Sequence, residues 1–217
     1  MEPNHEATMN DPKATQHDGF TLPELMIVIV IVGILSGISI ANFSQRWAQE
    51  RLLAASRHLQ SWIDTQRRIA MQEGKACELS INTTTAELKP SGSQIAISTS
   101  QSIPNGCANQ AGLNIKDSVS NGSSISLNIT PSNAKALRFS FRGHSEVVTK
   151  ETTTSTDDNG QNSSASEDTA SNQPLVLSLS LLGSNKKRCV KVISPIGLIR
   201  SGAGSITDNK CTYSHSF

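Results

Sequence analysis

An uncharged apolar run of 19 residues, Leu25 to Phe43, most strongly limits how this 217-residue chain can fold. At a rise of about 1.5 Å per residue, a helix of that length matches a bilayer core of roughly 30 Å. The hexad Gly19-Phe20-Thr21-Leu22-Pro23-Glu24 comes directly before the run and places one carboxylate, that of Glu24, next to its first residue. An ionisable side chain at membrane depth costs on the order of 2.5 to 3.5 kcal/mol, so Glu24 requires a partner or a function.

The segment before the run does not have the order of a cleaved secretory signal, which has a basic start and a cut site behind its apolar core. Residues 1–19 are polar, carry a net charge of −3 and lie wholly before the run. A cut that keeps the membrane segment must therefore fall at the front edge of the run. A cut after Gly19 gives Phe20 a free amine, which a neighbouring subunit could offer to Glu24 in a staggered bundle of identical helices.

The hexad GFTLPE and the apolar run resemble the class III signal of type IV prepilins and type II secretion pseudopilins. The resemblance implies that a prepilin peptidase cuts between Gly19 and Phe20 and methylates Phe20. It also implies that Glu24 neutralises a neighbouring amino terminus during assembly. The expected organisation is a leader at 1–19, removed on maturation, and a transmembrane and assembly helix at 20–43. An ordinary signal anchor with a chance hexad is the alternative.

After Phe43 the apolar side chains recur at steps of three and four, the spacing of an amphipathic helix. The pattern predicts that residues 44–74 continue the same helix, with both tryptophans packed against a soluble head and Gly74 as a left-handed stop. The whole helix would have roughly fifty residues, against an average of about 11 to 12 in globular proteins. A helix half in lipid and half on a head domain explains that length.

Residues 75–217 have the signals of a β-rich head. Alternating patterns predict strands at 77–81, 87–89, 94–98, 125–129, 137–141, 146–148, 176–182, 188–193 and 198–200. Antiparallel strands after one long helix indicate an α+β fold, with the helix packed on an antiparallel sheet. The spans 50–70, 137–143 and 189–202 resemble minor pilins and pseudopilins of the GspH/FimT type. That resemblance implies a pilin fold and a place at or near the tip of a pilus or pseudopilus.

Residues 150–173 break the strand pattern. They contain no apolar side chain larger than alanine, and five acids stand against one lysine. Because such a segment cannot bury enough surface to offset its ordering entropy, it is predicted to be a flexible, exposed insertion between two strands. An adhesive or glycosylated loop is the functional alternative to a tolerated insertion.

Basic residues are concentrated near the carboxyl end, where the sequence has only one acid, Asp208. The basic residues are Lys186, Lys187, Arg188, Lys191, Arg200 and Lys210. A strand at 188–193 puts Lys187 and Lys191 on one face, so these two lysines are predicted to project together. A basic patch at a fibre tip could hold DNA through phosphate contacts, with Lys186, Lys187, Arg188, Lys191 and Arg200 as candidate residues. The resemblance to FimT-like proteins implies DNA capture in natural transformation, although residues 197–200 retain only the second arginine of the associated GRxR-like motif. A solvated basic face is the alternative.

Four cysteines, Cys77, Cys107, Cys189 and Cys211, lie beyond the predicted membrane helix. An exported head in an oxidising compartment can use all four in disulfides, and four cysteines allow three pairings. Pairing Cys77 with Cys107 and Cys189 with Cys211 is favoured because each bond closes a local loop. The resemblance also supports a carboxyl-terminal bridge. A zinc site is the rival, but the chain has no CxxC pair and no regularly spaced histidines.

Catalysis has little support, because the chain contains neither a G-x-S-x-G elbow nor a Walker loop. The sequence therefore predicts a structural subunit without cofactor or metal, and the resemblance implies that it is a minor type IV pilin. Its expected partners are prepilin peptidase, other pilins or pseudopilins through the amino-terminal helix, the inner membrane before assembly and, in one alternative, DNA. It is expected to cross the inner membrane once, with its head exported, and then to enter a pilus or a periplasmic pseudopilus. A type II secretion pseudopilin, a DNA-binding receptor and an enzyme on a signal anchor are the alternatives.

Overall fold

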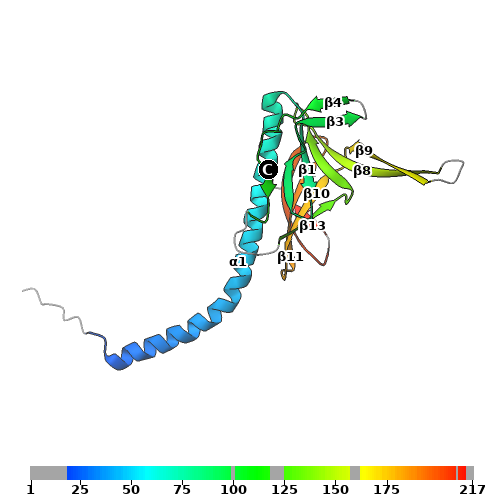
Figure 1. Cartoon of the computed structure of the whole chain (residues 1–217). Helices are drawn as coiled ribbons and strands as arrows, with labels where there is room; N and C mark the ends of the chain where they lie inside the picture. Colours follow the sequence, from blue (N-terminus) through cyan, green and yellow to red (C-terminus); the bar gives the residue numbers. More distant parts are fainter. Residues whose placement is uncertain (1–18, 99–100, 118–124, 157–161, 209, 214–217) are drawn as a thin grey trace, which may run out of the picture. The chain divides into compact units, whose positions relative to one another are not determined.

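The computed structural model describes residues 19–98, 101–117, 125–156, 162–208 and 210–213, and within these ranges it leaves out the side chains of residues 38–45, 98 and 151–167. The chain divides into two compact units, residues 1–43 and 44–217. One long helix is followed by strands in antiparallel sheets, so the expected α+β fold is confirmed (Figure 1).

Helix α1 runs from Leu22 to Glu73. It ends where the sequence predicts, because Gly74 adopts a left-handed conformation with φ +62°. The amide of Lys75 then donates to the carbonyl of Ala70 at 3.2 Å, which is the bond of a Schellman cap. The helix therefore has a local stop that does not depend on the rest of the fold.

The first sheet of the head has six strands in the order β5-β2-β1-β7-β8-β9, all paired antiparallel. Its strands are β1 (Cys77–Asn82), β2 (Glu87–Pro90), β5 (Leu113–Asn114), β7 (Ala134–Phe139), β8 (Ser145–Thr156) and β9 (Asn162–Ser171). In the middle of this sheet, Glu78 lies opposite Arg138, and the guanidinium donates to the Glu78 carboxylate at 2.7 and 2.9 Å. The ion pair ties β1 to β7 where both side chains are largely buried.

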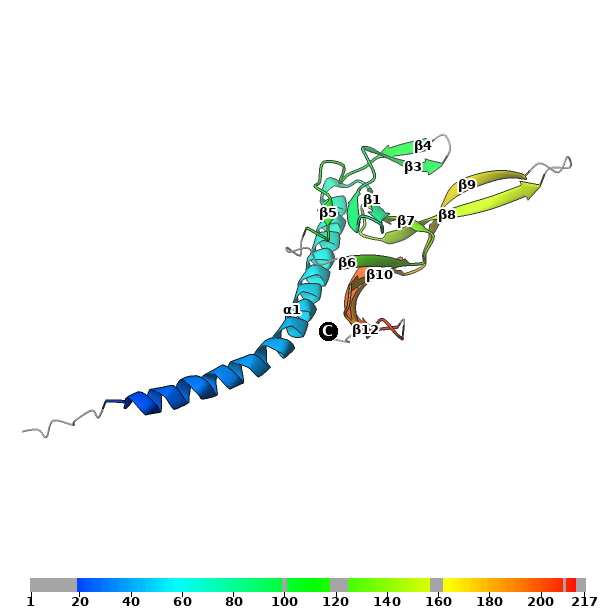
Figure 2. The same cartoon turned by 60° about the horizontal axis from the view of Figure 1, so that its bottom comes forward.

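The second sheet has five antiparallel strands in the order β13-β12-β11-β10-β6. Its strands are β6 (Ile125–Thr130), β10 (Leu175–Leu181), β11 (Lys186–Ile193), β12 (Leu198–Ser205) and β13 (Cys211–Tyr213). A separate ribbon pairs β3 (Gln94–Ser98) with β4 (Gln101–Pro104). In Figure 2 the five-stranded sheet and the part of α1 that belongs to the same unit lie side by side.

The core of the head lies between the carboxyl-terminal part of α1 and the two sheets. Buried side chains come from all three: Leu52, Leu59 and Ile63 from α1; Leu79, Leu137 and Phe139 from the first sheet; Leu177, Leu179, Val190 and Val192 from the second. Trp62 packs against this cluster, whereas Trp47 is 51% exposed. The prediction that both tryptophans pack on the head is therefore wrong for Trp47, because the buried stripe of α1 begins only at Leu52.

Arg67 on α1 connects the two sheets. Its Nε donates to the carbonyl of Gly143 in the β7–β8 turn at 3.0 Å, and its Nη2 donates to the carbonyl of Ile196 in the β11–β12 turn at 3.4 Å. Gly197 has φ +68°, and a Cβ there would collide with the Gly143 carbonyl. The three spans that resemble GspH/FimT-type proteins thus meet at one arginine, a contact that no pattern within a single span could indicate.

Residues 150–173, predicted to be a flexible insertion, are mostly paired in the structure. Strands β8 and β9 form a hairpin with a regular register from Val147 opposite Ser171 to Thr156 opposite Asn162. The hairpin extends from the rest of the head as a two-stranded ribbon in both views (Figures 1 and 2). Much of the predicted insertion is thus extended backbone paired in two strands, which a threonine-rich sequence favours even without apolar side chains. Residues 157–161 lie outside the described residues.

Candidate assembly segment and basic carboxyl-terminal region

Gly19 and Phe20 stand before the first turn of α1, and both are exposed; the exposed fraction of Phe20 is 83%. The helix begins at Leu22, and the amide of Leu25 donates to the carbonyl of Thr21 at 3.2 Å. Pro23 fits this position because the first-turn amides have no helical acceptor. The Gly19–Phe20 peptide bond therefore lies outside the helix, where an enzyme can reach it.

Glu24 lies in the first turn of α1. A carboxylate is favourable there, because the amino-terminal end of a helix carries a partial positive charge. The ion pairs found among the described residues do not involve Glu24.

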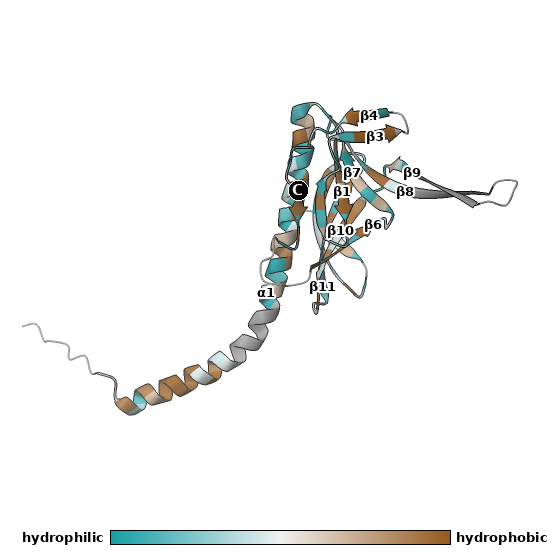
Figure 3. Ribbon diagram, in the orientation of Figure 1, coloured by the Kyte–Doolittle hydropathy of each residue, from teal (hydrophilic) through white to brown (hydrophobic). Residues whose placement is uncertain are grey.

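The helix beyond Glu24 presents apolar side chains all round, which appear as the brown segment of α1 in Figure 3. The exposed fractions of Leu25 and Leu35 are 58% and 60%, and the aliphatic side chains between them are similarly exposed. Among the helical residues with described side chains, no segment is both long and apolar enough to cross a membrane.

Both disulfides that the loop argument favours are present: Cys77 is bonded to Cys107, and Cys189 to Cys211. The two Cα atoms are 5.2 Å apart in the first pair and 6.3 Å in the second. Near the first bond, the Asn105 carboxamide accepts from the amide of Cys107 and exchanges two hydrogen bonds with the backbone of Glu78. This disulfide therefore fixes the β4–β5 connection on β1.

The second disulfide crosses strand β12 at two glycines. Cys189 on β11 lies opposite Gly202, and Cys211 on β13 lies opposite Gly204. A Cβ at Gly202 would lie 2.7 Å from an atom of the Tyr213 ring. The sequence Gly202-Ala203-Gly204 thus leaves room for the disulfide and the ring over β12, a signal that the sequence analysis missed.

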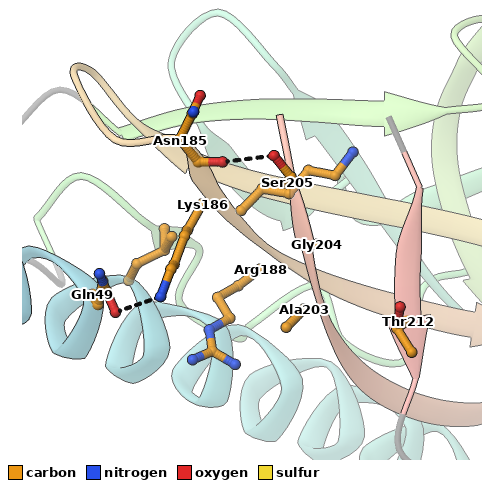
Figure 4. Close-up of a pocket in the computed structure, with 10 residues that line it drawn as sticks. Gln49, Asn185, Lys186, Arg188, Ala203, Gly204, Ser205 and Thr212 are labelled. Atoms are coloured by element: carbon orange, nitrogen blue, oxygen red, sulfur yellow. Dashed lines mark hydrogen bonds between the residues drawn. The ribbon is translucent and has the colours of Figure 1, made fainter. Parts of the chain in front are cut away.

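The basic residues of the carboxyl-terminal region do not form one patch. Lys186 and Arg188 lie toward α1, where the Lys186 ammonium donates to Gln49 Oε1 at 3.0 Å (Figure 4). Lys187 shares a face with Lys191, as predicted, but only 6% of it is exposed. The prediction that these two lysines project together is wrong, because the buried Lys187 side chain lies against Gly204 of β12, the residue opposite it in the sheet.

Two of the predicted basic residues, Lys191 and Arg200, are neighbours in the structure. They lie directly opposite each other on β11 and β12 and are partly exposed. The Lys191 ammonium lies 5.5 Å from the centroid of the Tyr213 ring. Two cations and an aromatic ring thus share the face of the sheet that carries the second disulfide. In the described part of the chain, no three His, Cys, Asp or Glu side chains come together as a metal-binding group.

Burial raises the pKa of the Tyr213 phenol above its usual value of 10.0. Because the neutral phenol is the favoured form in the fold, its contribution to stability is present below pH 10 and is lost as the pH rises further. Tyr213 is the one tyrosine of the sequence, so tyrosinate absorbance reports it alone. We expect a titration midpoint above pH 10 for the folded chain and near 10 in denaturant; equal midpoints would contradict the burial.

Residues 15–40 match the family model described as the prokaryotic N-terminal methylation motif. This motif at the start of one long helix, followed by antiparallel sheets, supports a type IV pilin-like protein. A similar solved structure is the type IV minor pilin FimU of Pseudomonas aeruginosa strain PAO1. It is 11% identical, the match covers 76% of this chain and 94% of that one, and the TM-score is 0.43. No curated protein matches the sequence.

Proposed function

We propose that this chain is a minor type IV pilin. It is cut between Gly19 and Phe20 by prepilin peptidase at the inner membrane, methylated at Phe20, and built into a fibre at or near its tip through α1. The observation that carries the proposal is the methylation motif at the exposed front edge of an apolar helix. The charge of Glu24 at that edge, which takes part in none of the ion pairs found among the described residues, supports docking onto the amine of a neighbouring subunit.

The head supports a role as an outward-facing structural subunit. It is closed by two disulfides, which suit an oxidising compartment. It also carries the long β8–β9 hairpin, a feature that a densely packed repeating subunit would have to accommodate at every position. A single copy near a tip avoids that constraint. The resemblance of three spans to GspH/FimT-type proteins supports the same position.

A DNA-binding receptor pilin is the second candidate function. It is favoured by Lys191, Arg200 and Tyr213, because a ring beside two cations can contact a base and its phosphates. In this candidate Lys186, Lys187 and Arg188 are not part of the contact surface, since they lie toward α1 or are buried.

One strain series tests both functions and the pseudopilin alternative. Deletion of the gene should reduce piliation, and the unchanged gene should restore it. A Lys191→Glu, Arg200→Glu variant should restore piliation fully; a transformation defect that persists in this variant would favour the DNA receptor. Normal piliation of the deletion strain with impaired protein secretion would instead identify a type II secretion pseudopilin and contradict the pilin proposal.

A further inference from the structure

Basic residues at the start of β11 line a groove beside α1. A cavity of about 560 Å³ lies between Gln49 and Leu52 of α1 and strands β11 to β13, and its lining contains Lys186, Lys187 and Arg188. A second cavity of about 220 Å³ shares Arg188 with the first and adds Arg57. No Asp or Glu lines either cavity among the described residues. Volumes of this order suit a small anionic group.

Two cations of this groove, Lys186 and Arg188, have no acid partner among the ion pairs found in the described residues. The Lys186 ammonium donates to a neutral carboxamide. Figure 4 shows both side chains reaching from β11 toward α1. The groove therefore presents a net positive surface to a ligand.

Apolar side chains stand at the same end of the head. Leu182, in the β10–β11 turn just before Lys186, is 88% exposed. Ile206 is 44% exposed, and its amide donates to the carbonyl of Asn185 at 3.0 Å, which places it beside that turn. Trp47, two residues before Gln49, is 51% exposed. Exposed aliphatic and tryptophan side chains beside cations are characteristic of surfaces that meet a membrane interface.

The chain itself limits how far this surface can be from the apolar run. Gln49 is six residues beyond Phe43, the last residue of the run. Six residues reach at most about 20 Å, even when fully extended. If residues 20–43 lie in the membrane, chain length alone keeps Gln49, a residue of the groove lining, within that distance of the end of the run.

We propose that this groove binds the phosphate of an anionic phospholipid while the chain waits in the inner membrane before assembly. Lys186 and Arg188 hold the phosphate, and Leu182, Ile206 and Trp47 contact the acyl boundary. The proposal rests on the proposed function, since it needs a membrane-anchored chain. Duplex DNA shares the phosphate chemistry, but exposed aliphatic side chains beside the cations favour lipid.

The test uses the complete mature chain purified in a neutral detergent and mixed with equimolar phosphatidylglycerol and phosphatidylcholine. Native mass spectrometry counts the retained lipids. The unchanged chain should prefer phosphatidylglycerol, and Lys186→Gln with Arg188→Gln should reduce the preference by roughly fivefold per cation, about 25-fold together. Leu182→Ser should weaken retention of both lipids without changing their ratio, because it removes an acyl contact and no charge. This variant tests the proposal even if the double variant does not fold.

The matched control is Lys75→Gln with Arg142→Gln, which removes two exposed cations that do not line the groove. It should keep the full preference; an equal loss there would overturn the proposal, as would no preference in the unchanged chain. Displacement of the lipid by equimolar glycerol 3-phosphate or by a short DNA duplex would assign the groove to those ligands instead. Cleavage of the precursor by prepilin peptidase is scored separately, so failure of the pilin function can be distinguished from failure of the lipid proposal.

Discussion

Glu24→Gln should abolish incorporation of this chain into fibres while leaving its cleavage intact. The variant keeps the size of the side chain and removes its charge, so the amine of a neighbouring subunit would enter the apolar bundle without a partner. Loss of one member of a buried ion pair costs about 3 to 5 kcal/mol, which corresponds to at least a hundredfold loss of assembly. The amount of this chain in sheared fibres, relative to the amount in membranes, measures the effect.

Glu50→Gln is the matched control, because Glu50 is an exposed acid on the same helix beyond the apolar run. It should assemble normally. Gly19→Val separates cleavage from docking, since a side chain before the scissile bond should leave the leader of residues 1–19 attached. Intact mass spectrometry detects that leader. Normal incorporation of Glu24→Gln would show that Glu24 does not dock a neighbouring amine.

Structural features that depend on residues close together in the sequence could be predicted from it. The apolar run, the continued helical spacing and Gly74 are local signals, and α1 ends at Glu73 as they indicate. The cysteine pairs could also be predicted, because a bond within a short loop is favoured over one that spans the head. Strand alternation likewise placed Lys187 and Lys191 on one face.

Structural features that depend on contacts between residues far apart in the sequence could not be predicted from it. The burial of Lys187 depends on β12, which no pattern around Lys187 describes. The exposure of Trp47 depends on where the sheets end along α1. The short strands β5 and β13 have two and three residues, too few for an alternating pattern to emerge. The cationic groove combines α1 with β11 to β13 and exists only in the folded chain.

The phenylalanines of residues 137–141 illustrate the same limit. Alternation places Phe139 and Phe141 on one face of the strand predicted at 137–141. In the structure β7 ends at Phe139, and the following turn takes Phe141 out of the sheet. Phe139 is fully buried, whereas Phe141 is 53% exposed with the Arg142 guanidinium 5.3 Å from its ring centroid.

Phe139→Ala should therefore reduce the free energy of unfolding by about 3 to 5 kcal/mol, because it leaves a cavity in the core between α1 and the first sheet. Phe141→Ala, the matched control, should cost less than about 1 kcal/mol, since it removes an exposed ring and one weak cation–π contact. Denaturant unfolding of the mature chain in detergent, followed by tryptophan fluorescence, measures both. If Phe139→Ala does not fold, Phe139→Leu should still unfold about 1 kcal/mol more easily than the unchanged chain. Equal losses at positions 139 and 141 would mean that β7 continues to Phe141 and that the core of the head is packed differently.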